Sequence, residues 1–238
     1  MTHGAFVWHD LMCTDPAAAA GFYAELFGWT CKNGRFLREG TPVAGIVALD
    51  PDLGWPSHWL PYVAVDDVDA AVGKGMAHGG MPLLPPADAP DSAAGSGGRF
   101  AVLADPGGAA FGLVRGSAPA VATGVGAITW DELLTDDDAV RSFYARALGY
   151  AVGVADMGPL GAGWALKAGG EARASILASP LATPPIWVAY VSVADVGAVL
   201  AKVEPLGGRV VLAAVEIEGV GTVALVEDPT GAIVGLLG

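Results

Sequence analysis

Two stretches of the chain begin with the same alternation of apolar and polar residues. Residues 7–15 read VWHDLMCTD and residues 128–136 read ITWDELLTD. In the residues that follow, up to Trp29 and Tyr150, apolar side chains recur at helical spacing, with an Asp near the start and a Gly near the end. Asp caps helix N-termini and Gly ends helices in the left-handed conformation. The pattern predicts a strand followed by an amphipathic helix, written twice.

The repetition continues through the rest of both halves. Phe22-Tyr23 returns as Phe143-Tyr144, and WLPYVAVDDVDAAV (59–72) returns as WVAYVSVADVGAVL (187–200). These later helices end at a Gly-Gly pair, and each is followed by a hairpin with an Asp-Pro-x-Gly turn, which is typical of a type I turn. Each half therefore contains two strand-helix-strands units, and GSAPAVATG (116–124) is the expected linker.

The motifs W-x-[DE]-L, T-D-x6–7-F-Y-x4-G-[WY] and D-P-x-G-x3-G, in this order and twice, resemble those of the vicinal oxygen chelate superfamily, also called glyoxalase/bleomycin-resistance/dioxygenase proteins. The resemblance implies an α+β fold with two tandem domains, 1–115 and 125–238. Each domain would be a pair of βαβββ units whose sheet curves around a cup that holds ligand or metal.

Metal-binding members of this superfamily carry His or Glu on the first and last strands of the paired units. Here those positions fall on apolar, glycine or serine residues: Trp8, Leu60, Trp130 and Val188, then near Gly45 and Ser175 and on Gly112 and Gly235. None of these residue types supplies the imidazole, carboxylate or thiolate that catalytic metals require. The resemblance, carried over position by position, therefore implies no metal.

One alternative metal site is an iron site made from His9, Asp10 and His58. All four histidines lie in the first half of the chain. Because side chains alternate along a strand, however, His9 should point away from the face that Trp8 and Asp10 share. Strand alternation therefore argues against this site.

The same alternation places one carboxylate in each cup, Asp10 beside Trp8 and Met12, and Glu132 beside Trp130 and Leu134. A carboxylate among apolar side chains has a raised pKa, which suits general acid or base catalysis. Each carboxylate could instead accept hydrogen bonds that hold the domain together, and the recurrence favours that structural role for at least one of them. We predict Asp10 and Glu132 as the catalytic candidates.

The candidate substrate-binding residues are aromatic, glycine and neighbouring side chains of the cups: Trp8, Met12, His58, Trp59, Tyr62, Gly112, Trp130, Trp187, Tyr190 and Gly235. The two glycines either open space for a ligand or allow tight packing between sheets. The first half alone retains His58, Arg35, Arg38 and a Pro/Gly-rich segment, 82–98, that could cover the cup mouth. We therefore place the working cup in the first half.

Composition narrows the function further. The chain has 238 residues, 53% of them hydrophobic and 16% charged, with a mean hydropathy of +0.50, yet no apolar run approaches the length of a membrane span. The net charge of −13 disfavours nucleic acid and anionic membranes as partners. The start of the chain has no export signal, so the expected location is the cytoplasm. Cys13 and Cys31 fit no metal or disulfide pattern and are expected as reduced thiols.

Two functions remain open. The first is a metal-independent enzyme of specialised metabolism, a cyclase, lyase, isomerase or hydrolase, in which a cup carboxylate moves a proton on an apolar, polyketide-like small molecule. The second is a binding protein that sequesters an aromatic drug or metabolite, as the bleomycin-resistance branch implies. The sequence has no Gly-rich phosphate loop, nucleophile elbow or dinucleotide fingerprint, so no nucleotide cofactor is expected. Either a monomer or a homodimer is compatible with four fused units.

Overall fold

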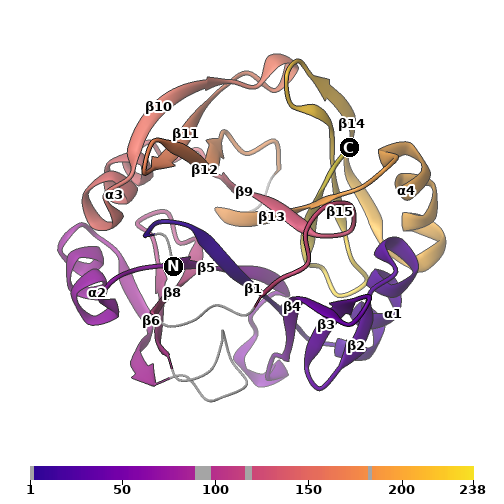
Figure 1. Ribbon diagram of the computed structural model, residues 1–238, viewed down its shortest axis with the longest axis horizontal. Coiled ribbons are helices and arrows are strands. Elements are labelled where there is room, and N and C mark those ends of the chain that lie inside the picture. The colour runs from indigo at the N-terminus through magenta and orange to yellow at the C-terminus, as the bar shows by residue number, and fades with distance from the viewer. Residues whose placement is uncertain (1–2, 89–97, 116–119, 182–183) are drawn as a thin grey trace.

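The structure, a computed structural model, describes residues 3–88, 98–115, 120–181 and 184–238 (Figure 1). Its strands form two mixed sheets of eight strands each, with the same order of strands in both. The first runs β2-β3-β4-β1-β5-β8-β7-β6, and the second runs β10-β11-β12-β9-β13-β16-β15-β14. The predicted α+β fold is confirmed.

The first sheet contains β1 (Phe6–Cys13), β2 (Thr30–Lys32), β3 (Arg35–Arg38), β4 (Thr41–Ala48), β5 (His58–Ala64), β6 (Met81–Asp88), β7 (Arg99–Ala104) and β8 (Ala110–Arg115). The second contains β9 (Ile128–Leu134), β10 (Ala151–Asp156), β11 (Ala162–Ala168), β12 (Glu171–Leu177), β13 (Ile186–Ser192), β14 (Arg209–Ile217), β15 (Gly221–Glu227) and β16 (Ile233–Leu237). The helices are α1 (Pro16–Phe27), α2 (Val68–Ala77), α3 (Ala139–Leu148) and α4 (Val196–Val203), with short 3₁₀ turns η1 (Pro51–Leu53), η2 (Gly158–Leu160) and η3 (Glu204–Leu206).

The repeat predicted from the sequence is present in the topology. Trp8 lies on β1 and Trp130 on β9, and each of these strands is the fourth in its sheet. β1 pairs with β4 in parallel and with β5 in antiparallel orientation, and β9 pairs in the same way with β12 and β13. The two tryptophans therefore occupy equivalent elements.

The helices pair between the halves of the chain rather than within them. Figure 1 shows α1 beside α4 at one side of the molecule and α2 beside α3 at the other, and both pairs are in contact. One hydrophobic core combines α1 and β1 of the first half with α4, β13 and β16 of the second. The other core combines α2, β7 and β8 with α3, β11 and β12. The helix-bearing faces of the two sheets are thus buried against each other.

The Phe-Tyr motif of each first helix explains why the Asp-Pro turn recurs. The Tyr23 hydroxyl donates to Asp228 Oδ2 at 3.1 Å and accepts from Trp59 Nε1 at 3.1 Å. Asp228 belongs to the turn before β16, in the other half of the chain. The motif therefore joins the two halves through a fully buried hydroxyl.

The second half of the chain has the equivalent network, in which its own tyrosine bonds an aspartate of the first half. The Tyr144 hydroxyl donates to Asp105 Oδ2 at 3.0 Å and accepts from Trp187 Nε1 at 3.0 Å. Asp105 Oδ1 also accepts from the backbone N–H of Ala109, which closes the turn before β8. Each Asp-Pro turn is consequently both a hairpin turn and an acceptor for the opposite half.

The Gly-Gly pairs also allow the two halves of the chain to pack against each other. A Cβ at Gly208 would lie 2.7 Å from a ring carbon of Phe22, and a Cβ at Gly80 would lie 2.9 Å from a ring carbon of Phe143. Both distances are shorter than real Cβ contacts allow, so only glycine lets the phenylalanine of the opposite half pack here. The glycines are therefore required by packing.

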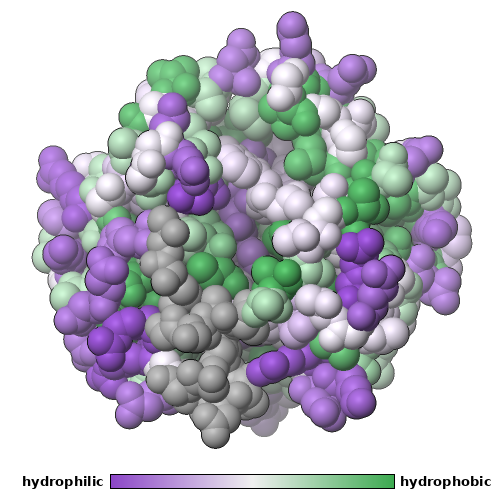
Figure 2. Space-filling model, viewed as in Figure 1, coloured by the Kyte–Doolittle hydropathy of each residue, from purple (hydrophilic) through white to green (hydrophobic). Residues whose placement is uncertain are grey.

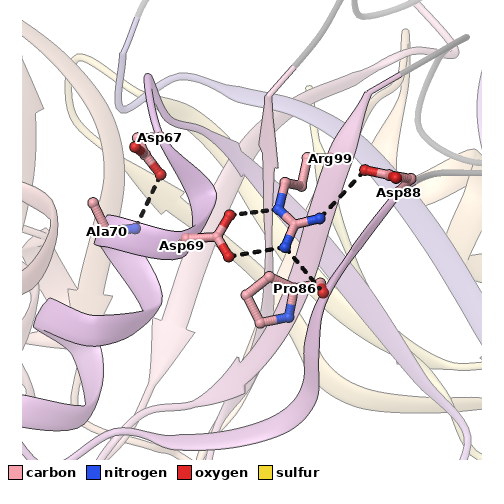
Figure 3. Close-up of polar contacts among 6 residues, drawn as sticks. All are labelled: Asp67, Asp69, Ala70, Pro86, Asp88 and Arg99. Carbon is pink, nitrogen blue, oxygen red and sulfur yellow. Dashed lines mark hydrogen bonds and ion pairs between the residues drawn. The ribbon is translucent and has the colours of Figure 1, made fainter.

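A charged cluster fixes α2 to the far edge of the first sheet (Figure 3). Arg99 on β7 forms hydrogen bonds with both carboxylate oxygens of Asp69 on α2 and pairs with Asp88 on β6 at 3.3 Å. The hydrogen bonds from Arg99 lower the pKa of Asp69, which keeps that carboxylate charged. Asp67 caps the helix by accepting from the backbone N–H of Ala70. These contacts hold α2 against β6 and β7, the last two strands at one end of the first sheet.

Two further sequence expectations concern cysteines and membranes. Cys13 is buried in β1 and Cys31 is exposed, and both are free thiols. In the described part of the chain, every helix is too short or too polar to pass through a lipid bilayer.

Candidate functional site

The face of the first sheet that points away from the helices carries Trp8, Asp10 and Met12, which we call the first cup together with Leu60 and Tyr62 of β5. In register, Trp8 lies opposite Tyr62, Asp10 opposite Leu60, and Met12 opposite His58. Trp8, Leu60, Tyr62 and Met12 form one apolar cluster. The alternation predicted from the sequence for β1 is confirmed.

Asp10 is the buried carboxylate of this cup, with 8% of its surface exposed. Trp8 Nε1 donates to Asp10 Oδ1 at 2.8 Å, and the Tyr62 hydroxyl forms a second hydrogen bond to this side chain. Burial raises the pKa of Asp10, and the two hydrogen bonds, together with the electrostatic effects of His9 and Arg35, offset part of that rise. Asp10 therefore holds a proton more readily than an exposed aspartate does.

Two glycines lie under the polar groups of the first cup. A Cβ on Gly45 would lie 1.9 Å from Asp10 Oδ1, and a Cβ on Gly112 would lie 2.2 Å from the Tyr62 ring. The resemblance to the metal-binding superfamily implies ligand positions near Gly45 and on Gly112. The space that a ligand side chain would need is taken by Asp10 and Tyr62, so the residues present do not fit a metal. In the residue ranges that the structure describes, no three His, Cys, Asp or Glu side chains form a cluster that could hold a metal ion.

Arg35 brings a positive charge to the same face. On β3 it lies opposite Gly45, which in turn lies opposite Asp10 on β1. Its guanidinium carbon is 5.9 Å from the centroid of the Trp8 ring, within range of a cation–π contact. Arg35 is partly exposed, so the cup has a charged wall in contact with solvent.

His58 is the third polar group of the first cup. Its Nδ1 lies 2.9 Å from the Pro56 carbonyl oxygen, which can only accept, so Nδ1 carries the proton and Nε2 is an acceptor in the neutral ring. Burial lowers the pKa of His58, which favours the neutral ring at neutral pH. His58 can therefore accept a hydrogen bond from a ligand hydroxyl.

The equivalent face of the second sheet, the second cup, contains Glu132 in place of Asp10. Its Oε1 accepts from the Tyr190 hydroxyl at 2.8 Å and its Oε2 accepts from Ser175 Oγ at 2.8 Å. Ser175 Oγ also accepts from Trp130 Nε1 at 2.9 Å. Burial raises the pKa of Glu132, whose exposed fraction is only 2%. Like Asp10, Glu132 therefore accepts two hydrogen bonds from side chains of its own cup.

The two cups differ in the polar groups that surround the carboxylate. The register that places Arg35 and His58 in the first cup places Ala165 and Ile186 at the equivalent positions of the second. The second cup is lined mostly by apolar side chains, and Figure 2 shows a hollow near the centre of the face over this sheet. Of the two cups, as far as the described residues form them, the first alone combines an acid, a cation and a neutral acceptor.

The side chains that line the two cups also differ in their exposure to solvent. In the first cup, Met12, Phe100, Val102 and Ala110 are partly exposed. Their register equivalents in the second cup are at most 8% exposed: Leu134, Val223, Leu225 and Ile233. Trp130 is the opposite case, because it is partly exposed whereas Trp8 is buried. Apolar surface in contact with solvent is thus available in both cups, and more of the first cup's wall is open.

The structure does not bring all the predicted binding residues together. Trp59 and Trp187 lie on the helix-facing sides of β5 and β13, where they donate to Tyr23 and Tyr144 in the two cores. Their prediction as cup residues is wrong. Strand alternation already separates Trp59 from Tyr62, three residues away, and the same holds for Trp187 and Tyr190. Gly235 lies under the Tyr190 ring as Gly112 lies under Tyr62, so packing beneath a tyrosine accounts for both glycines.

His9 points away from the cup, as the alternation predicts, and its partner was not foreseen. His9 Nε2 lies 2.8 Å from Oδ1 of Asp131, and both side chains are buried. Asp131 occupies the position on β9 that His9 occupies on β1, so the pair joins the two central strands. The sequence shows only that both residues stand next to the cup acids, which does not indicate that they meet.

The segment predicted to cover the first cup is described only in part. Residues 82–88 belong to β6, residue 98 precedes β7, and residues 89–97 lie outside the described residues. Arg38, the other cation of β3, donates to the backbone oxygen of Thr123 and so contacts the segment between the sheets.

Comparison with known proteins places these features among relatives. Residues 6–114 match the glyoxalase-like domain family. A protein of Mycobacterium tuberculosis (strain CDC 1551 / Oshkosh) named "Putative glyoxylase CFP32" is 34% identical over 247 residues, which cover 97% of this chain and 93% of the relative. Anthracycline biosynthesis protein DnrV of Streptomyces peucetius is 34% identical over 236 residues, which cover 87% of this chain and 83% of the relative.

Solved structures with the same fold include a metal-bound enzyme. The Mn(II)-bound glyoxalase from Novosphingobium aromaticivorans matches with a TM-score of 0.68 at 17% identity, over 99% of this chain and 82% of that one. The 2,2',3-trihydroxybiphenyl 1,2-dioxygenase of Sphingomonas wittichii strain RW1 matches with a TM-score of 0.64 at 16% identity, over 99% and 90% of the two chains. At these identities the likeness concerns the fold alone.

Proposed function

Because this chain belongs to the glyoxalase/vicinal oxygen chelate superfamily, in which cups of this kind hold small molecules, we propose that its first cup is the active site of a metal-independent enzyme. Asp10 is the general acid or base of that site. The enzyme is a cyclase, lyase, isomerase or hydrolase, because general acid or base catalysis can promote the bond changes of these reactions without a redox cofactor.

The observation that carries the proposal is the difference between the two carboxylates. Each carboxylate accepts two hydrogen bonds from side chains of its own cup, so the difference lies in the other polar groups nearby. The second cup has Ala165 and Ile186 where the first cup has Arg35 and His58. Asp10 combines a raised pKa with a partly exposed cation and a neutral imidazole on the same face. A buried carboxylate with these neighbours can exchange a proton with a bound ligand at neutral pH.

The glycines support independence from metal. An enzyme that used the superfamily's metal would need ligand side chains at the positions of Gly45 and Gly112, where Asp10 and Tyr62 leave no room for a Cβ. Proton transfer by Asp10 therefore supplies the chemistry in this proposal.

The names of two relatives favour a substrate of specialised metabolism. DnrV, and DauV of Streptomyces sp. (strain C5), are both named for anthracycline biosynthesis, and each is 34% identical to this chain. Anthracyclines are fused-ring aromatic ketones, and flat rings suit a cup walled by Trp8, Met12 and Phe100. We propose a substrate of this apolar, ring-containing class.

The test compares Asp10→Asn with the matched variant Glu132→Gln in turnover of a panel of fused-ring ketones and hydroxyquinones, followed by chromatography. Asn keeps the size and hydrogen-bonding capacity of Asp10 but cannot exchange a proton, so turnover should fall by about 100-fold or more while ligand binding and stability remain. Glu132→Gln should retain turnover. Loss of turnover in Glu132→Gln alone would move the active site to the second cup.

A second function, sequestration of an aromatic molecule, is favoured by the apolar lining of the second cup and the partly exposed Trp130. In that case an aromatic ligand quenches tryptophan fluorescence, no compound in the panel is converted, and neither carboxylate variant changes binding.

A further inference from the structure

The polar groups of the first cup are arranged in a line across three strands. Asp10 on β1, Gly45 on β4 and Arg35 on β3 are register neighbours, so their side-chain positions point to the same face. With strands about 4.8 Å apart, the backbones that carry Asp10 and Arg35 are separated by about 10 Å. The position between them has no side chain.

The glycine at the middle position, Gly45, determines how the Asp10 carboxylate is oriented. The Asp10 carboxylate leans over Gly45, since a Cβ there would lie 1.9 Å from its Oδ1. The carboxylate is therefore directed toward the strand that carries Arg35, and the Arg35 charge acts on it. In the second sheet the same position is Ser175, whose hydroxyl is bonded to Glu132, and the far position is Ala165. Among the described residues, an acid and a cation therefore share this register line in the first cup and not in the second.

We propose, building on the proposed function of this cup, that Arg35 binds the oxyanion of the substrate, which makes the substrate a ring ketone or phenol with an ionisable oxygen. In the reaction, the Asp10 carboxylate takes a proton from the carbon next to a ketone. The electrons of the broken C–H bond form a C=C bond, and the electrons of the C=O double bond move to the oxygen. The guanidinium of Arg35 stabilises that enolate oxygen.

The chemistry of Arg35 suits the binding of an oxyanion, and that of Asp10 suits the transfer of a proton. A guanidinium stays charged at any working pH and offers five N–H donors, so it can bind an oxyanion while it remains near the Trp8 ring. Asp10, with its two hydrogen-bond donors Trp8 and Tyr62, can return the proton to a different atom of the substrate. Opposite charges placed near the reacting atoms stabilise the developing charge, which is the effect expected of an oxyanion site.

The test uses alizarin, a dihydroxyanthraquinone whose absorption spectrum changes when a phenol ionises. The pKa of bound alizarin is measured by pH titration in wild type, Arg35→Gln, Arg38→Gln and Asp10→Asn. Arg35 should favour the bound phenolate, so Arg35→Gln should raise the pKa of the bound dye by about 1 unit or more. Arg38→Gln, on the same strand, contacts Thr123 instead and should leave that pKa unchanged.

Asp10→Asn separates this inference from the proposed function. Removing the negative charge should lower the pKa of the bound dye, opposite to the change in Arg35→Gln. If Arg35→Gln leaves the dye pKa at the wild-type value, or if wild type does not bind alizarin, the oxyanion inference is wrong. The assignment of Asp10 would still stand or fall by the turnover of Asp10→Asn. Thermal unfolding of Arg35→Gln shows whether the variant is folded at the temperature of the titration.

Discussion

Replacing Tyr23 by Phe tests whether the repeated motifs join the two halves of the chain. The change removes one hydroxyl that donates to Asp228 at 3.1 Å and accepts from Trp59 Nε1 at 3.1 Å. The tyrosine is fully buried, so water cannot replace the lost contacts. Asp228 Oδ1 still accepts from Thr230 and Ala232, which keeps the turn itself intact.

The magnitude follows from the two contacts. A hydrogen bond to a charged group contributes about 1.5–3 kcal/mol, and a buried donor left without an acceptor costs about 1–3 kcal/mol. Because the contacts share one hydroxyl, their losses do not add fully, and we expect Tyr23→Phe to lower the free energy of unfolding by about 2–4 kcal/mol. In a chain of this length the melting temperature should fall by roughly 4–16 °C.

Urea unfolding followed by tryptophan fluorescence and by circular dichroism measures this loss. Tyr144→Phe should cost a similar amount, since Tyr144 has the same contacts with Asp105 and Trp187. The two hydroxyls lie in separate cores, so the double variant should lose the sum of both within about 0.5 kcal/mol. Tyr150→Phe is the control, because its hydroxyl makes one hydrogen bond to the Gly4 carbonyl, worth about 1 kcal/mol. If Tyr23→Phe costs no more than this control, the networks do not hold the halves together.

Three other predictions concern the cups. Elemental analysis of the purified protein should find no stoichiometric metal, and a chelator should leave its activity unchanged; about one iron, zinc or manganese per chain with chelator-sensitive activity would contradict this. Gly45→Ala should displace Asp10 and lower both turnover and stability, the latter by about 1–3 kcal/mol, whereas Gly21→Ala on α1, where a Cβ meets no atom within 4 Å, should stabilise the protein slightly. Because burial raises the pKa of Glu132 above its ordinary 4.5, wild type should lose stability as the pH rises from that value toward the raised one, and Glu132→Gln should lack this slope in urea midpoints measured across that range.

The fold was predictable because its motifs are short-range and repeated. Capping Asp residues, helix-ending glycines and Asp-Pro turns each follow from local backbone requirements, and the order in which they recur indicated two copies of one topology. The same local reasoning placed Trp8, Asp10 and Met12 on one face of β1, because residues alternate strictly along a strand.

The contacts between the halves could not be predicted in this way. Tyr23 meets Asp228, and His9 meets Asp131, across separations of 205 and 122 residues, and no periodicity specifies such a partner. Trp59 is a different case, because it resembles Tyr62 in type but stands three residues away on β5, so alternation places the two on opposite faces. The sequence indicates Arg35 only as a charge of the first half, because its proximity to Asp10 depends on the register of β3, β4 and β1.

A crystal structure of the protein with bound alizarin tests the central claim most directly, namely that the first cup is the working site. We expect ligand density in the first cup, with one oxygen atom within hydrogen-bond distance of Asp10 and another facing Arg35, and with the rings against Trp8 and Met12. Density in the second cup alone, against Trp130 and Tyr190, would contradict the claim, as would a metal ion bound between Asp10 and the ligand.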